Sequence, residues 1–141
     1  MQCRHVFSLI STVSAGSCTG LIAGPESSAV SPVSVSRDSA YVRARRGMQA
    51  EAFTMDIADS LAGHIVGTRY PSSNAGSGSP AACRVRVVLD VDGNSEKAQV
   101  ATTSRWLAPE SMQEQASKVC EEERTDVLSR VAATIEPPAA Q

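Results

Sequence analysis

Residues 83–96 read CRVRVVLDVDGNSE, and this stretch decides the predicted fold. Apolar side chains alternate with arginines and acids as far as Val91, which is the period-two pattern of a strand with one face in a core and the other in water. Asp92-Gly93 then predicts a tight turn, because glycine accepts positive φ at little energetic cost. Alternation resumes after the turn, so the sequence predicts a β-hairpin over 83–103. Its apolar face would consist of Val85, Val87, Leu89, Val91, Ala98, Val100 and Thr102.

The acidic residues of this stretch are compatible with a second chemistry, a calcium-binding loop. An EF-hand loop needs oxygen ligands at its positions 1, 3 and 5, glycine at position 6 and a bidentate glutamate at position 12. Counted from Asp90, glycine arrives at the fourth position, and the twelfth residue is Ala101. Because both obligatory positions are wrong, the sequence favours the hairpin. We expect no metal site and no cofactor.

The segment before the hairpin has the pattern of an amphipathic helix. Apolar residues recur every four positions from Phe53 to Ile65, which predicts a helix over 50–66 that stops at Gly67. The following stretch, 68–82, is rich in proline, glycine and serine, and it predicts a long loop. The apolar stripe of this helix would have to cover the hairpin.

A second helix is predicted after the hairpin, from Pro109 to about residue 135, and Pro137-Pro138 end it. Its apolar face would consist of Met112, Ala116, Val119, Cys120, Val127, Leu128, Val131 and Ile135. The predicted fold class is therefore α+β, with a small antiparallel sheet, the hairpin 83–103, packed against two helices.

The first residues have the order of a bacterial secretion signal. Basic residues precede a short apolar run, VFSLISTVSA (6–15), and small residues follow it. The run is too short to be a permanent membrane helix. We therefore expect 1–24 to be a secretion signal and the protein to be periplasmic or secreted. A lipid anchor at Cys18 is the less favoured alternative, because Ala15 stands where a lipobox usually has leucine.

The rest of the chain divides into a spacer, a folded domain and a tail. Residues 25–49 are rich in serine, proline and arginine without helical periodicity, which predicts a flexible spacer. Residues 50–138 would form the domain, and 139–141 the tail.

The chain carries 13 basic and 15 acidic residues, and most of the acids lie after residue 50. Nucleic acid is therefore an improbable partner, because phosphate binding needs a basic surface.

The cysteines support export. Two of the four lie in the predicted signal, which leaves Cys83 and Cys120. The first begins the predicted strand on its apolar face, and the second lies on the apolar face of the second helix. A helix packed over that strand would bring them together, so we expect a disulfide, and two unpaired buried thiols are the alternative. A bond that closes such a loop would stabilise the fold by roughly 4 kcal/mol on the chain-entropy model.

Several segments together resemble the C-terminal domain of TolA, and in part the related domain of TonB. They are MDIADSLAGHIVGTRYP (55–71), CRVRVVLDVDG (83–93), Cys120 and IEPP (135–138). The resemblance covers about residues 52–138. It implies a periplasmic adaptor domain that has no active site and works by binding other envelope proteins.

The chain departs from that family after the two prolines. The family continues there into a third strand, which is missing before Gln141. One hairpin edge would then stay open, and another chain could add a strand to it. We expect such binding next to Val85–Val91 or Ala98–Thr102, either to an envelope protein segment or to a second copy. Alternatively, VSPVSVS (30–36) folds back and occupies this edge, for which Pro32 makes it less suitable.

Three function classes follow from these patterns. We favour a non-enzymatic protein-binding module, followed by a small secreted structural or inhibitory protein that caps a partner. A small hydrolase is least favoured, because His64 is the only histidine after the signal and no nucleophile motif accompanies it. Trp106 either packs against the first turn of the second helix or, if exposed, anchors a partner.

Overall fold

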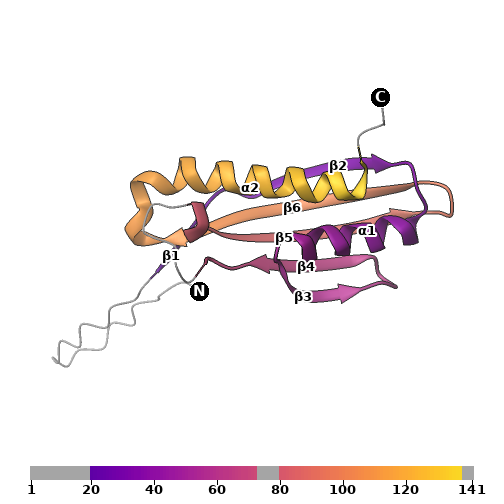
Figure 1. The fold of residues 1–141 in the computed structure, drawn as a ribbon, viewed down its shortest axis with the longest axis horizontal. Helices are drawn as coiled ribbons and strands as arrows, with labels where there is room; N and C mark the ends of the chain where they lie inside the picture. The colour runs from indigo at the N-terminus through magenta and orange to yellow at the C-terminus, as the bar shows by residue number, and fades with distance from the viewer. Residues whose placement is uncertain (1–19, 73–79, 138–141) are drawn as a thin grey trace, which may run out of the picture.

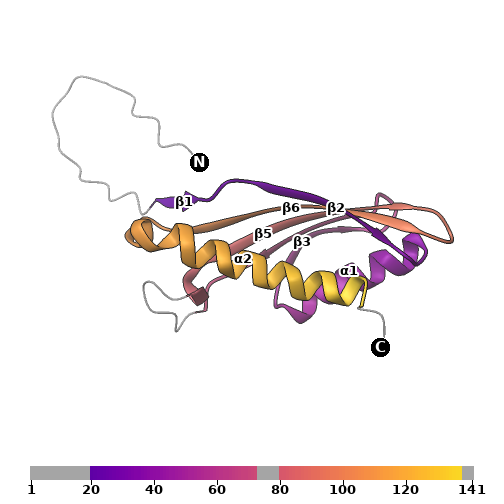
Figure 2. The ribbon, with the colours of Figure 1, turned by 90° about the horizontal axis from the view of Figure 1, so that it is seen from above.

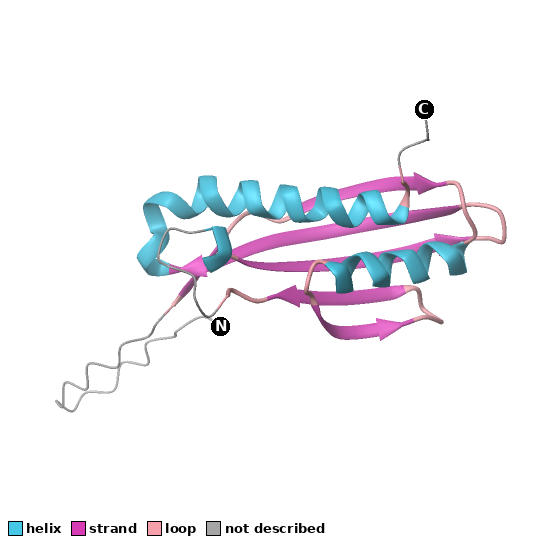
Figure 3. Cartoon of the chain, viewed as in Figure 1, coloured by secondary structure: helices cyan, strands magenta, loops and turns pink. Residues whose placement is uncertain are grey.

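The computed structural model of the chain describes residues 20–72 and 80–137, and Figures 1 and 3 show its fold. The strands are β1 (Leu21–Ala23), β2 (Ser27–Val33), β3 (Thr54–Asp59), β4 (His64–Arg69), β5 (Arg84–Gly93) and β6 (Ala98–Pro109). The helices are α1 (Arg37–Ala50) and α2 (Gln113–Ile135). Two 3₁₀ turns, η1 (Pro80–Ala82) and η2 (Glu110–Met112), precede β5 and α2.

All six strands belong to one antiparallel sheet, in the order β1-β6-β5-β4-β3, with β2 also paired to β6. β1 and β2 follow one another along the same side of β6, since Leu21 lies opposite Pro109 and Val33 lies opposite Ala98. Both helices lie on one face of the sheet (Figure 2). No helix of the described residues lies on the opposite face of the sheet.

The core lies between the sheet and the two helices. The alternation predicted for β5 is observed, and it buries one row of side chains against the helices. This row consists of Val85, Val87, Leu89 and Val91, and it meets Ala40, Ala44 and Met48 of α1 and Val127 and Val131 of α2. Full burial of one such aliphatic side chain contributes about 1.5–3 kcal/mol. The inner face of the sheet therefore supplies most of the apolar surface that holds the fold together.

The predicted fold class is wrong in the size of the sheet. The hairpin over 83–103 exists, but β4 and β3 extend it on one side and β1 and β2 on the other. No strand is missing, because β2 pairs with β6 over Ser27–Val33. The alternative in which 30–36 folds back onto the hairpin edge is confirmed for 30–33, which pairs with 98–101 of β6. The TolA-like and TonB-like fold is wrong.

The predicted helix over 50–66 is also wrong, because this segment forms the hairpin of β3 and β4. Its turn is fixed by the Asp59 carboxylate, whose Oδ1 accepts hydrogen bonds from the backbone N–H groups of Leu61 and Ala62 at 3.0 Å each. Gly63 completes the turn with a φ of +71°. Of the stripe with a spacing of four residues, Phe53 and Ile65 are buried, but Ile57 is 48% and Leu61 93% exposed, so the four side chains do not share one buried face. Gly67, the expected helix stop, lies within β4.

The predicted spacer 25–49 contains β2 and nearly all of α1. The helix begins at an N-cap, where the Oγ of Ser36 accepts a hydrogen bond from the backbone N–H of Ser39 at 3.2 Å. Its buried face combines three small residues with one tyrosine and one methionine and contains no leucine, isoleucine or valine: Ala40, Tyr41, Ala44, Gly47 and Met48. This face gives a weak amphipathic pattern in the sequence, which explains why the helix is not predicted.

The ends of the chain lie largely outside the described residues. Residues 1–19, which include most of the predicted signal and Cys18, and residues 138–141 are not described. In the described part, no helix is both long enough and apolar enough to cross a membrane.

Candidate functional site

A hollow of about 600 Å³ opens between the second half of α2 and the side of the sheet formed by β2 and β6. We call it the groove. Its floor contains Leu89 and Val100, which are buried on the inner face of the sheet. The walls come from β2 and α2. They are lined by Ala29, Ser31, Pro32 and Val33 on one side and by Leu128, Ser129, Ala132 and Ala133 on the other.

The groove follows from the small side chains of both walls. α2 packs against α1 and β6, and β2 lies beyond β6 in the sheet. Ala29 and Ser31 on β2 face Ala132 and Ser129 on α2 across the hollow, and none of these side chains is long enough to fill it. The space therefore stays open while the neighbouring part of the interface, around Val127, is packed.

Two hydrogen bonds fix α2 at the C-terminal end of the groove. The backbone N–H of Ser34, directly after β2, donates to Oε2 of Glu136 at 3.0 Å. The Arg43 side chain of α1 donates through Nη1 to the carbonyl oxygen of Ile135 at 3.2 Å. These bonds tie the end of the helix to both β2 and α1, so the hollow has a defined end.

The groove is chemically almost neutral. The one charged side chain among its described lining residues is Glu136, and this carboxylate already accepts the hydrogen bond from Ser34. The remaining polar groups are hydroxyls of Ser31, Thr102, Thr125 and Ser129. Basic residues, histidine and cysteine do not appear among the described lining residues. Such a lining suits binding of an uncharged apolar molecule better than acid–base or nucleophilic chemistry.

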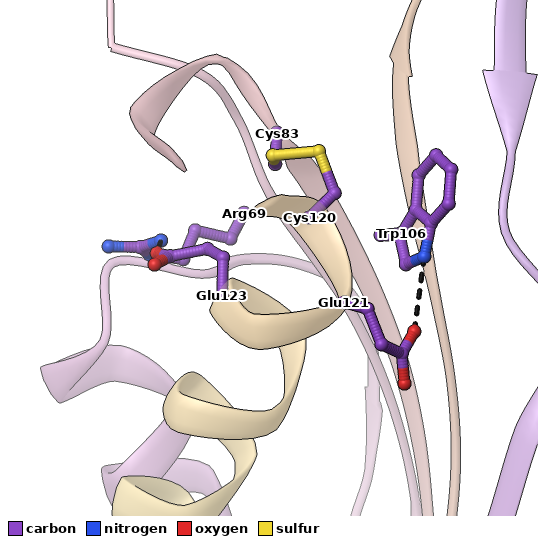
Figure 4. The surroundings of a disulfide bond; sticks show 6 residues. All are labelled: Arg69, Cys83, Trp106, Cys120, Glu121 and Glu123. Carbon is purple, nitrogen blue, oxygen red and sulfur yellow. Dashed lines mark hydrogen bonds and ion pairs between the residues drawn. A yellow bond between two sulfur atoms is a disulfide. The ribbon is translucent and has the colours of Figure 1, made fainter. Parts of the chain in front are cut away.

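A polar network holds the first half of α2 to β6 (Figure 4). Trp106 donates from Nε1 to Oε2 of Glu121 at 3.1 Å, and Arg124 forms an ion pair with the same carboxylate. Arg124 also donates from Nη1 to Oγ of Ser104 at 3.0 Å and is itself buried. The hydrogen bond from Arg124 is the main reason that the pKa of Glu121 lies below its ordinary value.

The expected disulfide is confirmed. Cys83, the residue before β5, is bonded to Cys120 in α2, and their Cα atoms lie 5.5 Å apart. Beside it, Arg69 at the end of β4 forms an ion pair with Glu123 of α2. The covalent bond and this ion pair hold the first half of α2 over β4 and β5. A disulfide is typical of proteins in oxidising compartments, which is compatible with a periplasmic or secreted protein.

The strand edge expected at Val85–Val91 and Ala98–Thr102 is not an edge. β5 pairs with both β4 and β6, and β6 pairs with β5 on one side and with β1 and β2 on the other. Their backbone groups are therefore used within the sheet. The apolar side chains proposed for this edge face the helices instead, where Leu89, Val100 and Thr102 line the groove.

The other predicted site residues, Trp106, Asp92 and Gly93, contribute to the packing and the strand ends of the fold. Trp106 is only 4% exposed and contacts the network on α2, so it is not an exposed anchor. Asp92 and Gly93 end β5, and the connection to β6 runs through residues 94–97. There, the backbone N–H of Asn94 donates to the carbonyl of Lys97 at 2.9 Å, so the turn lies after the predicted position.

The acidic residues of the calcium loop that the sequence disfavours do not form a metal site. Asp90 instead lies 2.6 Å from Nδ1 of His64, its partner across β4 and β5. In the described residues, no group of three or more histidine, cysteine or acidic side chains is arranged to hold a metal ion. The same His64–Asp90 pair is exposed and has no nucleophile in its hydrogen bonds, so it gives no support to a hydrolase.

Known proteins give no family and no function for this chain. No protein-family model matches the chain, and no curated protein matches it. The crystal structure of Ara h 8.0201 is similar with a TM-score of 0.46 and 6% identity, over 81% of this chain and 99% of that chain. Norcoclaurine synthase from Thalictrum flavum, solved with dopamine and hydroxybenzaldehyde, has a TM-score of 0.38 and 10% identity, over 94% of each chain. Neither structure is a TolA or TonB domain, and both likenesses are too low to support a function.

Sequence reasoning missed the groove because its wall on β2 lies in the segment interpreted as a spacer. Only Leu89, Val100 and Thr102 of the lining were singled out as site residues, and for a different role. The sequence signal for the wall on α2 is weak: Ala132 and Ala133 are small residues that lie between Val131 and Ile135 of the predicted apolar face.

Proposed function

We propose that this chain is a non-enzymatic binding protein that holds a small, uncharged apolar molecule in the groove between α2 and the β2–β6 side of the sheet. The observation that carries the proposal is the hollow of about 600 Å³ with an apolar floor. Small-molecule sites usually have volumes of about 300–1,000 Å³ and mostly apolar linings with a few polar groups. The groove has both properties.

The lining determines which ligand chemistry fits. Burial of an anionic headgroup, such as a fatty-acid carboxylate, requires a cationic partner. The described lining offers none, and Glu136 would repel such a group at the C-terminal end. The hydroxyls of Ser31, Thr102 and Ser129 can instead bond one or two neutral polar groups. We therefore expect a neutral ligand with a large apolar part.

Export to the periplasm or the extracellular space is part of the proposal. The disulfide between Cys83 and Cys120 supports it, because such bonds persist in oxidising compartments and are rare in the cytosol. The binding role expected from the sequence is thus kept, but the ligand is a small molecule and the site is a groove.

Strand addition by a protein partner is less favoured at the free edges of this sheet. One edge runs along β1 and β2, and the other runs along β3. Pro32 removes a backbone donor from β2. β3 is interrupted by an irregularity between Met55 and Ile57 and carries two aspartates. Proline, bulges and charges all oppose pairing with another chain.

The test is binding of Nile red, a neutral apolar dye whose fluorescence rises in apolar sites, to the oxidised protein and to an Ala29→Trp variant. Ala29 lies in the wall formed by β2, so an indole there would occupy the groove. Loss of roughly 60 Å² of ligand contact at about 25 cal/mol per Å² weakens binding by about tenfold. We expect a shift of at least that size in the dissociation constant.

The matched control is Ala58→Trp, which places the same side chain at an exposed strand position on β3, away from the groove. We expect this variant to bind the dye as the natural sequence does. Equal binding by both variants, or no binding by the unmodified protein, would show that the groove is not a ligand site.

A further inference from the structure

The face of the sheet that carries no helix presents a cluster of arginines. Because side chains alternate along β5, Arg84 and Arg86 lie on this face while Val85 and Val87 are buried on the other. The register places Arg86 directly opposite Arg105 of β6 and Arg84 directly opposite Leu107. Three guanidinium groups are therefore neighbours on one surface of a chain whose net charge is −2.

This cluster is poorly neutralised within the described residues. Arg105 has one ion pair, a long contact of 3.8 Å with Glu26, and neither Arg84 nor Arg86 has a carboxylate within ion-pair distance. Arg84 lies over the Tyr70 ring, 5.0 Å from its centroid, and its Nε is buried without a hydrogen-bond partner. Like charges directly opposite each other on neighbouring strands are destabilising. Among the described residues, the guanidinium groups of Arg84 and Arg86 therefore lack an ion-pair partner, and the Nε of Arg84 lacks a hydrogen-bond acceptor.

A hollow of about 270 Å³ lies beside two of these arginines. It is lined by Asp56, Thr68, Tyr70, Arg84, Arg86 and Leu107. The lining carries two positive charges, from Arg84 and Arg86, and one negative charge, from Asp56, whose carboxylate accepts a hydrogen bond from Oγ1 of Thr68 at 2.8 Å. Tyr70 is 52% exposed and offers an apolar ring surface next to them.

We propose that this hollow binds a small organic anion. Its phosphate or carboxylate lies between Arg84 and Arg86, because guanidinium groups form strong charge-assisted hydrogen bonds with both groups. Its apolar part lies against Tyr70 and Leu107. A second copy of the chain is not the occupant, since two such faces would bring their arginines together. The site is separate from the groove, which lies on the other face of the sheet.

The test is calorimetric titration of the oxidised full chain with phenyl phosphate and benzoate, and with neutral benzamide as the comparison ligand. We expect the two anions to bind and benzamide not to. Arg86→Gln should weaken binding of the anions by about tenfold or more, since hydrogen bonds to charged groups are worth about 1.5–3 kcal/mol. The same variant should be at least as resistant to urea as the natural sequence, because it removes the repulsion between Arg86 and Arg105.

Two further variants separate this site from general charge effects. Asp56→Asn removes the one negative charge that lines the hollow, so it should tighten anion binding. Arg105→Gln removes a positive charge from the same face but not from the hollow, so it should weaken binding much less than Arg86→Gln. Sedimentation with vesicles of phosphatidylglycerol, compared with phosphatidylcholine, tests whether a lipid headgroup supplies the anion.

Each outcome decides the proposal. Binding of phenyl phosphate that depends on Arg86 supports it with a free anion as ligand. Sedimentation with phosphatidylglycerol alone that depends on Arg86, without binding of the soluble anions, supports it with a lipid headgroup as ligand. Binding that is equal in Arg86→Gln and the natural sequence, or an equal response to benzamide, overturns it. So does the failure of both the soluble anions and the vesicles to bind.

Discussion

At the residue scale, Ala52 bears a backbone conformation that its side chain disfavours. Among the described residues it is the one non-glycine with positive φ, at 61°. It follows α1, where its N–H donates to the carbonyl of Gln49 at 3.1 Å, and the N–H of Phe53 donates to that of Met48 at 3.1 Å. This is the left-handed end of a helix at which glycine is usual. The strained residue, Ala52, lies in the connection between α1 and β3.

We predict that Ala52→Gly raises the free energy of unfolding by about 1 kcal/mol, because a left-handed conformation costs a residue with a Cβ about 1–2 kcal/mol and glycine much less. Urea denaturation measures this change. Ala50→Gly, at the last residue of α1, should instead lower the free energy of unfolding. A decrease in both variants would contradict the strain assigned to Ala52.

The carboxylate of Glu121 lies in the contact between α2 and β6, and its protonation at low pH lowers the free energy of unfolding. The hydrogen bond from Arg124 holds the pKa of Glu121 in the folded protein below its ordinary value of 4.5. A lowered carboxyl pKa stabilises the fold at pH values above the unfolded pKa, and this contribution is lost as the pH falls through the folded pKa. The loss therefore occurs at pH values below 4.5.

We predict that Glu121→Gln lowers the free energy of unfolding at pH 7 by about 1 kcal/mol, because it leaves the buried Arg124 without its ion-pair partner, while water partly screens the half-exposed carboxylate. The difference between the variant and the natural sequence should shrink as the pH falls below 4.5, since protonation neutralises the same carboxyl. Urea denaturation at pH 7 and at lower pH measures both effects. A difference that stays constant with pH would exclude this ion pair as its cause.

At the element scale, β5 and α2 could be predicted because their patterns match their environments. Each has one face in the core, and the cysteines on those two faces are bonded as expected. The hairpin of β3 and β4 could not be predicted in this way, because Ile57 and Leu61 are exposed and their spacing only resembles a helical stripe. The signals for the hairpin were Asp59 and Gly63, which fix its turn.

β2 and the groove could not be read from local sequence for a different reason. β2 pairs with β6 across 75 positions of the chain, as the contact between Ser28 and Thr103 shows. β2 is exposed along most of its length, with only Val33 buried, so its sequence lacks the apolar alternation of a strand with one buried face. The groove is then the space between α2 and this distant strand, so its existence depends on the tertiary arrangement rather than on any motif.

The disulfide is the strongest single link between α2 and the rest of the molecule. We predict that the double substitution Cys83→Ala and Cys120→Ala lowers the free energy of unfolding by about 4 kcal/mol, because the bond restricts the unfolded chain over a separation of 37 residues. Reduction of the natural protein should lower it similarly. Thiol labelling of the unfolded, unreduced protein checks the bond itself, and reaction of both cysteines without prior reduction would contradict it.

At the scale of the whole molecule, the sheet separates two surfaces of different chemistry. Its inner face, which both helices cover (Figure 2), contains the groove, whereas its outer face carries the arginine cluster. The central claim is that the neutral groove is the binding site. An uncharged apolar ligand should therefore contact α2 and β2 at the same time.

This claim is tested most directly by isotope-filtered NMR of the labelled, oxidised protein in the presence of Nile red. We predict intermolecular nuclear Overhauser effects from the dye to the methyl groups of Ala29 on β2 and of Leu128 and Ala132 on α2, which line the groove. Effects from the bound dye to the outer face of the sheet, for example to Ile57 or Leu107, with none to these three methyl-bearing residues, would contradict the claim.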